Sequence, residues 1–268
     1  MPRRRLTVLA ATLGLSALAL TACSGGTTSG ASSDAGSEYD LVSGGTLTVA
    51  TEGTYRPFSY HEGAGELTGF DVEIAKAVAD KLGLEVKFQE TQWDAIFAGL
   101  DAGRFDVIAN QVSINPERQE KYTFSSPYTV SRGVVVTTED DDSISSFADL
   151  SGKTTAQSLT SNWYELATSS GAQVEAVEGW AQAVALLKQG RVDATINDQL
   201  TYLDYEKTNS PTGLKIAAET EDTSESAFAF KKGQDELADA VNSALEELRA
   251  DGTLTQISEK YFGADVTQ

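Results

Sequence analysis

Cysteine, histidine and methionine are nearly missing from this chain, where each occurs once in 268 residues. The single cysteine, Cys23, lies near the N-terminus, so the folded part can form neither an internal disulfide nor a cysteine-ligated metal site. The single histidine, His61, lies in a segment rich in Gly and Glu that we expect to be exposed. Since the sequence has no Ser-His-Asp set, no cluster of metal ligands and no phosphate-binding loop, we expect a protein without a cofactor that is not an enzyme.

Basic residues are also scarce, with 20 Lys and Arg against 40 Asp and Glu, and the formal net charge is -20. A surface of this charge repels phosphates, so we expect no nucleic-acid partner. Removal of the N-terminal segment described next, with its three arginines, would make the chain more acidic still.

The N-terminal apolar run, Leu6–Leu20, has about 15 residues, fewer than the roughly 20 that span a bilayer. It follows Arg3–Arg5 and ends in Leu20-Thr21-Ala22-Cys23, which resembles the bacterial lipobox. The sequence therefore predicts a signal peptide over 1–22, cleavage before a lipidated Cys23, and attachment to the outer face of the cytoplasmic membrane through that lipid alone. Residues 23–44, mostly Ser, Gly, Thr, Ala and Asp, are predicted to be a flexible tether.

One phrase of the sequence occurs twice: LDAGRFDVIAN at 100–110 is echoed by LKQGRVDATIN at 187–197. Each copy is typical of a helix that stops with Gly at its C′ position, followed by Arg-x-Asp and a short strand ending in Asn. Because ligands of open α/β sheets bind beyond the carboxyl ends of strands, two such ends predict two similar lobes that face one cleft. Chance similarity is the alternative, because Gly-Arg-x-Asp is a common connection.

The order of strand and helix patterns predicts an α/β fold with mainly parallel sheets covered on both faces. Strand patterns of the first set lie at Thr46–Thr51, Leu84–Gln89 and Phe105–Asn110, with helices at Asp71–Leu82, which Asp71 could cap, and Asp94–Leu100. Those of the second set lie at Val134–Thr138, Thr154–Gln157, Gln173–Val177 and Asp193–Asn197, with helices at Asn162–Thr168 and Trp180–Gln189. A strand at Ser226–Phe230 and helices at Glu236–Arg249 and Leu254–Tyr261 return the chain to the first lobe. Lobe 1 is thus predicted at 45–131 plus 228–265 and lobe 2 at 132–227, joined by a two-strand hinge.

Three motifs, GTYRPFSY at 53–60, LTGFDVE at 67–73 and NQVSINPER at 110–118, resemble the amino-acid-binding lipoproteins of bacterial ABC importers, solute-binding protein family 3. Trp93-Asp94, SLTSN at 158–162 and the ending YFGADVT at 261–267 resemble the L-cystine-binding branch. The resemblance implies a periplasmic-binding-protein-like type II fold with the ligand cleft between its lobes. Thr160 departs from the family, which commonly has Gly in this loop.

The family pattern also implies roles for particular residues. Arg118 would clamp the ligand's carboxylate, since a guanidinium matches it with two parallel hydrogen bonds, and Asp198 would accept from the ammonium. Asp198 also reads as a helix N-cap, and both roles can coexist. Tyr55 and Trp93 would form aromatic walls. Further polar contacts are expected from Glu52, Asn110, Gln111, Ser113, Ser158, Ser161 and Asn162.

The expected function is an extracytoplasmic, monomeric binding lipoprotein that closes on an amino acid and delivers it to an ABC permease and its ATPase subunits. L-cystine is the expected ligand. One alternative is a binder of arginine, lysine or glutamine, which the Glu52 carboxylate leaves open. Another is an enzyme on the same fold that resembles cyclohexadienyl dehydratase, because a buried carboxylate such as Glu52 is a potential general acid. A sensory role is a further alternative.

Overall fold

The structure, a computed structural model, describes residues 39–268. The predicted signal peptide, Cys23 and residues 23–38 of the predicted tether lie outside the described residues. The last residues of that tether contact the folded part: the backbone N–H of Val42 donates to Asp106 Oδ1 at 2.7 Å, and Tyr39 and Leu41 pack on the core. Within residues 39–268, none of the helices combines the length and the apolar character that a membrane span requires.

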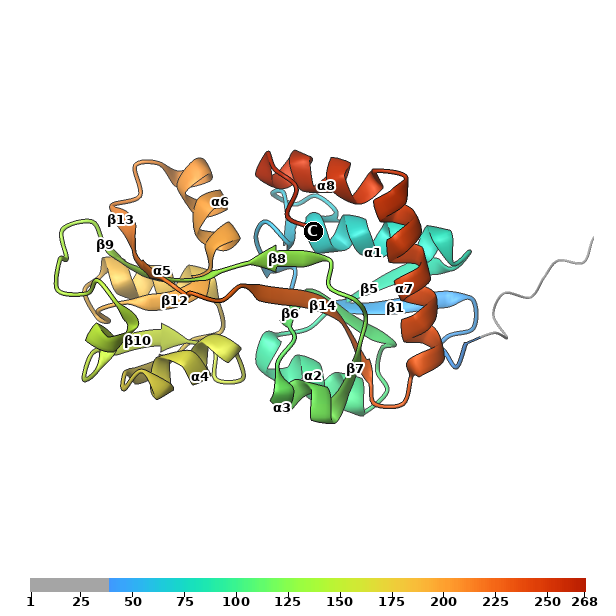
Figure 1. The fold of residues 1–268 in the computed structure, drawn as a ribbon, viewed down its shortest axis with the longest axis horizontal. Helices are drawn as coiled ribbons and strands as arrows, with labels where there is room; N and C mark the ends of the chain where they lie inside the picture. The colour runs from blue at the N-terminus through green and yellow to red at the C-terminus, as the bar shows by residue number, and fades with distance from the viewer. Residues whose placement is uncertain (1–38) are drawn as a thin grey trace, which may run out of the picture. The chain divides into compact units, whose positions relative to one another are not determined.

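The first sheet has the strand order β5-β1-β6-β14-β7, with β8 also paired to β14 (Figure 1). Its strands are β1 (Thr46–Thr51), β5 (Glu85–Glu90), β6 (Val107–Ser113), β7 (Tyr122–Phe124), β8 (Thr129–Ser131) and β14 (Ser224–Lys231). Helices α1 (Phe70–Lys81), α7 (Asp235–Ala250) and α8 (Thr253–Phe262) share one apolar core with it, and α2 (Trp93–Asp101) shares another. All seven residues of β6 are buried, as expected for a central strand covered on both faces.

The second sheet joins β12 (Thr195–Asp198), β9 (Gly133–Thr138) and β13 (Leu214–Glu219), while β10 (Thr154–Gln157) pairs with β11 (Gln173–Ala176). A bridge between Thr155 and Ala194 links the two groups. Successive residues of β9 point into different cores, Val135 toward the side of α4 (Asn162–Ser169) and Val134 and Val136 toward α5 (Trp180–Lys188). Both predicted layers of helices are therefore present in this lobe as well.

Two chain crossings connect the sheets, one at Arg132 between β8 and β9 and one between the end of β13 at Glu219 and the start of β14 at Ser224. The antiparallel pairs Ser224–Ser131 and Ser226–Thr129 hold them together beside the first sheet (Figure 1). The first crossing lies at the expected lobe boundary between residues 131 and 132, and the second precedes the expected boundary between residues 227 and 228.

The repeated phrase adopts the same local structure twice. Gly103 and Gly190 both have φ 66°, the left-handed conformation that ends a helix with glycine. Asp106 Oδ2 accepts from the N–H of Thr48 at 2.7 Å, and Asp193 Oδ2 accepts from the N–H of Thr154 at 2.8 Å, so each aspartate fixes the start of a neighbouring strand. The repeat thus reflects one helix-to-strand connection used twice rather than chance, although β6 continues past the predicted strand end at Asn110 to Ser113.

Two further expectations about the fold are wrong, and several elements were not predicted. The sheets are mixed rather than mainly parallel, because β14 runs antiparallel to its three neighbours and β9 antiparallel to its two. Asp71 does not cap α1, whose N-cap is Gly69, because its carboxylate binds Gln111. Several short elements also went unpredicted: α6 (Gln199–Asn209), α3 (Pro116–Lys121), the 3-10 helix η2 (Phe147–Leu150), β13, and the small sheet of β2 (Thr54–Tyr55), β3 (Ser59–His61) and β4 (Leu67–Thr68). Helix α6 buries the consecutive residues Leu200–Tyr202, so its helical periodicity is weak.

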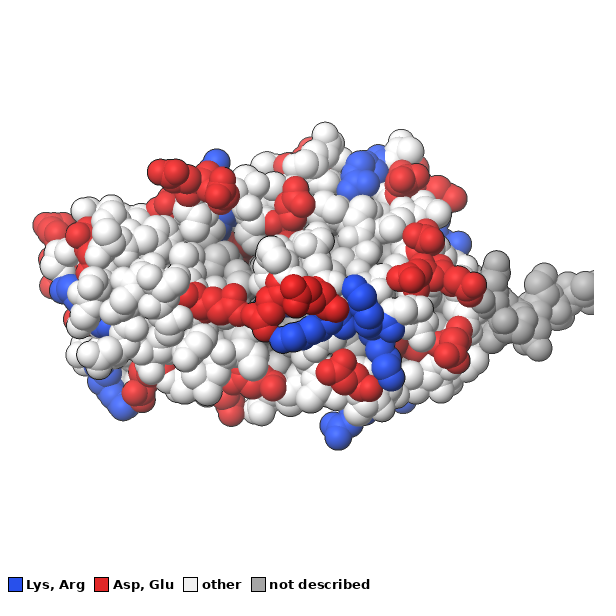
Figure 2. Space-filling model, turned by 60° about the horizontal axis from the view of Figure 1, so that its bottom comes forward, with Lys and Arg blue, Asp and Glu red and all other residues white. Residues whose placement is uncertain are grey.

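Acidic side chains are spread over the face shown in Figure 2, and the basic ones lie beside them rather than in a patch of their own. This distribution agrees with the acidic composition and offers no extended basic surface on that face.

Candidate functional site: a cavity between two strand ends

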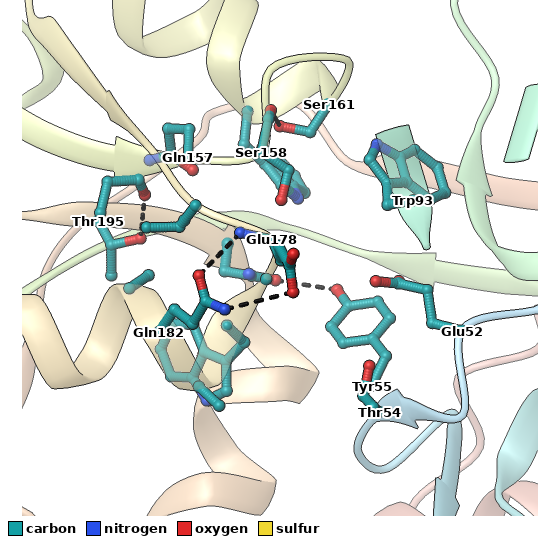
Figure 3. Close-up of a pocket in the computed structure, with 18 of the residues that line it drawn as sticks. Glu52, Thr54, Tyr55, Trp93, Gln157, Ser158, Ser161, Glu178, Gln182 and Thr195 are labelled. Atoms are coloured by element: carbon teal, nitrogen blue, oxygen red, sulfur yellow. Dashed lines mark hydrogen bonds between the residues drawn. The ribbon is translucent and has the colours of Figure 1, made fainter. Parts of the chain in front are cut away.

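A cavity of about 330 Å³ is lined by residues of both sheets (Figure 3). The first lobe supplies Glu52, Thr54, Tyr55, Gln92, Trp93, Asn110 and Gln111. The second supplies Ala156, Gln157, Ser158, Ser161, Asn162, Trp163, Val177, Glu178, Gly179, Trp180, Ala181, Gln182, Ala183, Thr195 and Asn197. Both asparagines that end the repeated phrase are among them, so the structure brings the two strand ends to one cavity.

Asn110 and Asn197 hold the polar floor of the cavity. Asn110 Oδ1 accepts from the N–H of Glu52 at 2.8 Å, and its Nδ2 donates to the Glu52 carboxylate at 2.6 Å. Asn197 Oδ1 accepts from the Tyr55 hydroxyl at 2.9 Å. The last bond joins the two lobes across the cavity.

Glu52 places a carboxylate in the cavity, and burial raises its pKa to about 7 against the opposing effect of the Asn110 bond. Burial also raises the pKa of Asp198 to about 6. Because desolvation penalises an unpaired carboxylate, a cationic group that entered the cavity would be stabilised by Glu52. The arrangement therefore favours a ligand with an ammonium or guanidinium group.

Tyr55 and Trp93 line the cavity from lobe 1, and Trp163 and Trp180 line it from lobe 2. The indole N–H groups of Trp93 and Trp180 and the Gln157 amide nitrogen are buried without a hydrogen-bond partner. Unpaired buried donors are uncommon, so these three offer bonds to an acceptor such as a carboxylate.

Arg118 does not line the cavity, but it is buried beside it. Its guanidinium lies 5.4 Å from the Trp93 ring centre and 5.3 Å from that of Phe97, and burial lowers its pKa to about 10. Nη1 donates to the Ser113 carbonyl at 3.0 Å, and Nη2 donates across to the Thr160 carbonyl at 3.2 Å. Arg118 is thus a buried cation between the lobes rather than a surface arginine paired with a neighbouring glutamate.

Asp198 and Ser113 also lie outside the cavity lining. Asp198 is the N-cap of α6: its Oδ1 accepts from the N–H of Leu200 at 2.8 Å and from the Ser131 hydroxyl at 2.7 Å. Ser113 bonds to the Ser224 hydroxyl at 3.2 Å. The structure therefore gathers eight of the eleven expected contact residues around the cavity, and leaves Arg118, Asp198 and Ser113 at its border.

The loop before α4 and the first residue of that helix carry three of the expected contacts, Ser158, Ser161 and Asn162, and Ser161 is the N-cap. Thr160 does not need the freedom of the family's glycine, because Gln111 is the one non-glycine with positive φ within residues 39–268. Its side chain has a use instead: Thr160 Oγ1 donates to Asp94 Oδ1 at 2.7 Å across the cleft.

Trp180 and its neighbours were missed, although a signal existed. Trp93 and Trp180 each begin a helix, α2 and α5, and each lies seven residues before the leucine that opens the repeated phrase. Extending the repeat upstream would have paired Trp180 with Trp93. By contrast, Glu178 and Gln182, which bond to each other and also line the cavity, belong to no comparable pattern in the sequence.

Among the described residues, no group of three His, Cys, Asp or Glu side chains is arranged to hold a metal ion.

The model of the bacterial extracellular solute-binding proteins, family 3, matches residues 47–264. The L-cystine-binding protein TcyA of Bacillus subtilis (strain 168) is 51% identical over 266 residues, 97% of this chain and 98% of TcyA. An unliganded, open L-cystine solute receptor of Neisseria gonorrhoeae is 48% identical with a TM-score of 0.58, covering 87% of this chain and 97% of the receptor. An ancestral arginine-binding protein bound to arginine is 38% identical but has a TM-score of 0.77, covering 81% of this chain and 98% of that protein. This chain thus superposes better on the arginine-bound protein than on the open receptor, although it is less identical to it. This agrees with the hydrogen bonds that join the two lobes of this chain, such as that from Tyr55 to Asn197. The chain belongs to the family 3 bacterial extracellular solute-binding proteins.

Proposed function

We propose that this protein captures L-cystine outside the cytoplasm and delivers it to an ABC permease and its ATPase subunits. The observation that supports it most is the cavity itself, which is lined from one lobe by the Glu52 carboxylate and from both lobes by residues whose amide or indole N–H groups are buried without a partner. A zwitterion such as cystine carries both complementary groups at each end. The 51% identity to an L-cystine-binding protein favours this ligand over other amino acids.

The mechanism we propose is closure about the two crossings, with lobes at about 45–131 plus 228–265 and 132–227. Ligand contacts to both lobes would favour the closed state over the open one. We further propose a signal peptide over 1–22, a lipid on Cys23 that anchors a monomer to the outer face of the membrane, and no enzymatic activity. A basic amino acid such as arginine is the second candidate, because Glu52 lines the cavity.

A thermal-shift panel of the described part, from Tyr39 onward so that the contacts of Tyr39, Leu41 and Val42 are kept, tests the ligand. At about a hundred times its dissociation constant, a ligand adds about 2.7 kcal/mol to the free energy of unfolding, which raises the midpoint by roughly 5–10 °C at this size. We expect that shift with L-cystine and not with the other amino acids. A shift with arginine alone would transfer the proposal to a basic ligand, and no shift with any amino acid would overturn it.

Asp198→Asn tests the ammonium contact that the family pattern implies. Asparagine can keep both bonds of the N-cap, from Leu200 and from Ser131, but it removes the charge. We expect the ligand-free protein to unfold at a similar temperature and the dissociation constant to rise at least about tenfold, the loss of one charged hydrogen bond. Titration calorimetry measures it, with Asp193→Asn as the matched control because Asp193 also accepts from a backbone N–H but is exposed, whereas Asp198 is buried next to the lining residue Asn197. An unchanged affinity would remove Asp198 from the site.

A further inference from the structure

Gln111 has an unusual backbone at the centre of the cavity wall. Its φ is 50°, in the left-handed region that favours glycine, and this occurs in β6, a strand that is otherwise extended. The pairing of β6 with β14 shifts register at the same place, between Ala227 and Ala229. Backbone strain of this kind persists only where the surroundings enforce it, and it is concentrated at ligand sites.

The surroundings that enforce it are a buried carboxylate. Asp71, on α1, is completely buried. Its Oδ2 accepts from the backbone N–H of Gln111 at 2.7 Å, and its Oδ1 accepts from Gln111 Nε2, also at 2.7 Å. Nε2 donates its second proton to Thr129 Oγ1 at 3.1 Å. Both protons of the Gln111 amide are therefore directed into the protein.

The amide oxygen is left over. Gln111 Oε1 is buried without a partner, while Gln111 is 8% exposed and lines the cavity. An amide group has nearly the same shape when its oxygen and nitrogen are exchanged, so only its partners decide which end is presented. In its ionised form the Asp71 carboxylate accepts and cannot donate, so it holds the Gln111 nitrogen on its own side and leaves the oxygen without a protein partner.

Burial of a carboxylate costs more free energy than burial of a neutral side chain, so packing alone does not explain an aspartate at position 71. Within residues 39–268, no salt bridge pairs Asp71 with a basic side chain, and burial raises its pKa to about 7 although the Gln111 bonds oppose this. A neutral asparagine would bond to the same backbone N–H without that desolvation. What an asparagine would not do is fix the orientation of the Gln111 amide.

We propose that Asp71 is a positioning residue that turns the Gln111 amide oxygen into the cavity, where it accepts a hydrogen bond from an ammonium group of the ligand. The inference rests on the proposed function, because it concerns how that cavity recognises an amino acid. In this view the charge of Asp71, which does not touch the ligand, sets the orientation of the neutral Gln111 side chain. That orientation in turn makes the side chain prefer a ligand group with an N–H donor.

Three variants separate this role from simple packing. In Asp71→Asn, the amide oxygen keeps the bond from the Gln111 backbone, so the NH₂ group meets the Gln111 side chain and turns its nitrogen toward the cavity. L-cystine should then bind at least about tenfold more weakly, because the Gln111 N–H and the ligand's ammonium group are both donors and cannot bond to each other. In the double variant Asp71→Asn with Gln111→Glu, one oxygen of the new carboxylate accepts from the asparagine and the other faces the cavity. The dissociation constant of this double variant should return to within about threefold of the wild-type value. Gln111→Glu alone places two carboxylates together, so that single variant should not bind as tightly as wild type.

Calorimetry on the folded variants decides the outcome. If Asp71 only supports packing, the double variant carries two disturbances and will bind no better than Asp71→Asn, which would overturn the proposal. A ligand without ammonium groups, 3,3′-dithiodipropionate, supplies a second readout: any binding of it should weaken less in Asp71→Asn than binding of L-cystine.

The orientation can also be measured without any ligand. The ¹⁵N side-chain resonance of Gln111, identified by its loss in Gln111→Glu, should show slow proton exchange in wild type and faster exchange in Asp71→Asn. Exchange at the solvent rate in wild type would refute the orientation. If wild type binds no amino acid while exchange is slow, the proposed function fails and the positioning by Asp71 stands.

Discussion

Arg118→Lys is expected to raise the dissociation constant of the ligand at least about a hundredfold, and Arg118→Ala to abolish detectable binding. The guanidinium has five N–H donors, of which the bonds to the Ser113 and Thr160 carbonyls use two. The others remain for a carboxylate, and two charge-assisted hydrogen bonds at about 1.5–3 kcal/mol each account for the loss. Lysine keeps the charge but lacks the planar fork, so it cannot replace the arginine.

Arg249→Lys is the matched control for this prediction. Arg249 also donates to two backbone carbonyls, those of Pro127 and Thr267, but it lies outside the cavity lining. Its replacement should leave affinity within about threefold of wild type. Calorimetry should be accompanied by thermal unfolding of each variant, because Arg118 packs between two aromatic rings. Ligand binding by Arg118→Ala that equals that of wild type would exclude the clamp.

The repeated phrase explains why so much of the fold was predictable. The helix stops at Gly103 and Gly190, and the strands that follow each of them, depend on neighbours in sequence, so local patterns contain them. The direction of β14 depends on a partner more than a hundred residues away, β6, and no local pattern encodes it. This is why mixed sheets were mistaken for mainly parallel ones.

The cavity was predictable to a similar degree and for a similar reason. Residues in motifs, such as Tyr55 and Trp93, were expected at the site and line the cavity, whereas Glu178 and Gln182 lie there only because distant segments meet. Asp71 is the clearest failure: its position before a helix suggested a local cap, but its carboxylate acts forty residues along the chain, on Gln111. Long-range polar contacts of this kind have no signature in a single sequence.

Ligand affinity is expected to rise with pH between about 5 and 7, by up to about tenfold per unit, and then to level off. Burial raises the pKa of Glu52 to about 7, and a ligand ammonium binds its ionised form, so binding below that pH must expel a proton. The contribution of Glu52 to the stability of the ligand-free protein should show the opposite trend. Because Glu52 ionises near pH 4.5 in the unfolded state, that contribution is fully present below this value and is lost as pH rises through 7.

Glu52→Gln should flatten the rise in affinity, although buried Asp71 and Asp198 titrate in the same direction and leave a residual slope. His61→Gln is the control, because His61 is also titratable, with a pKa that its bonds to Gly65 and Glu90 raise, but it is exposed at the end of β3 and outside the cavity lining. Calorimetry in buffers of different ionisation enthalpy counts the protons released at pH 6. A count that is unchanged in Glu52→Gln but reduced in His61→Gln would assign the pH dependence to His61, and Glu52 would then not be the group that meets the ammonium.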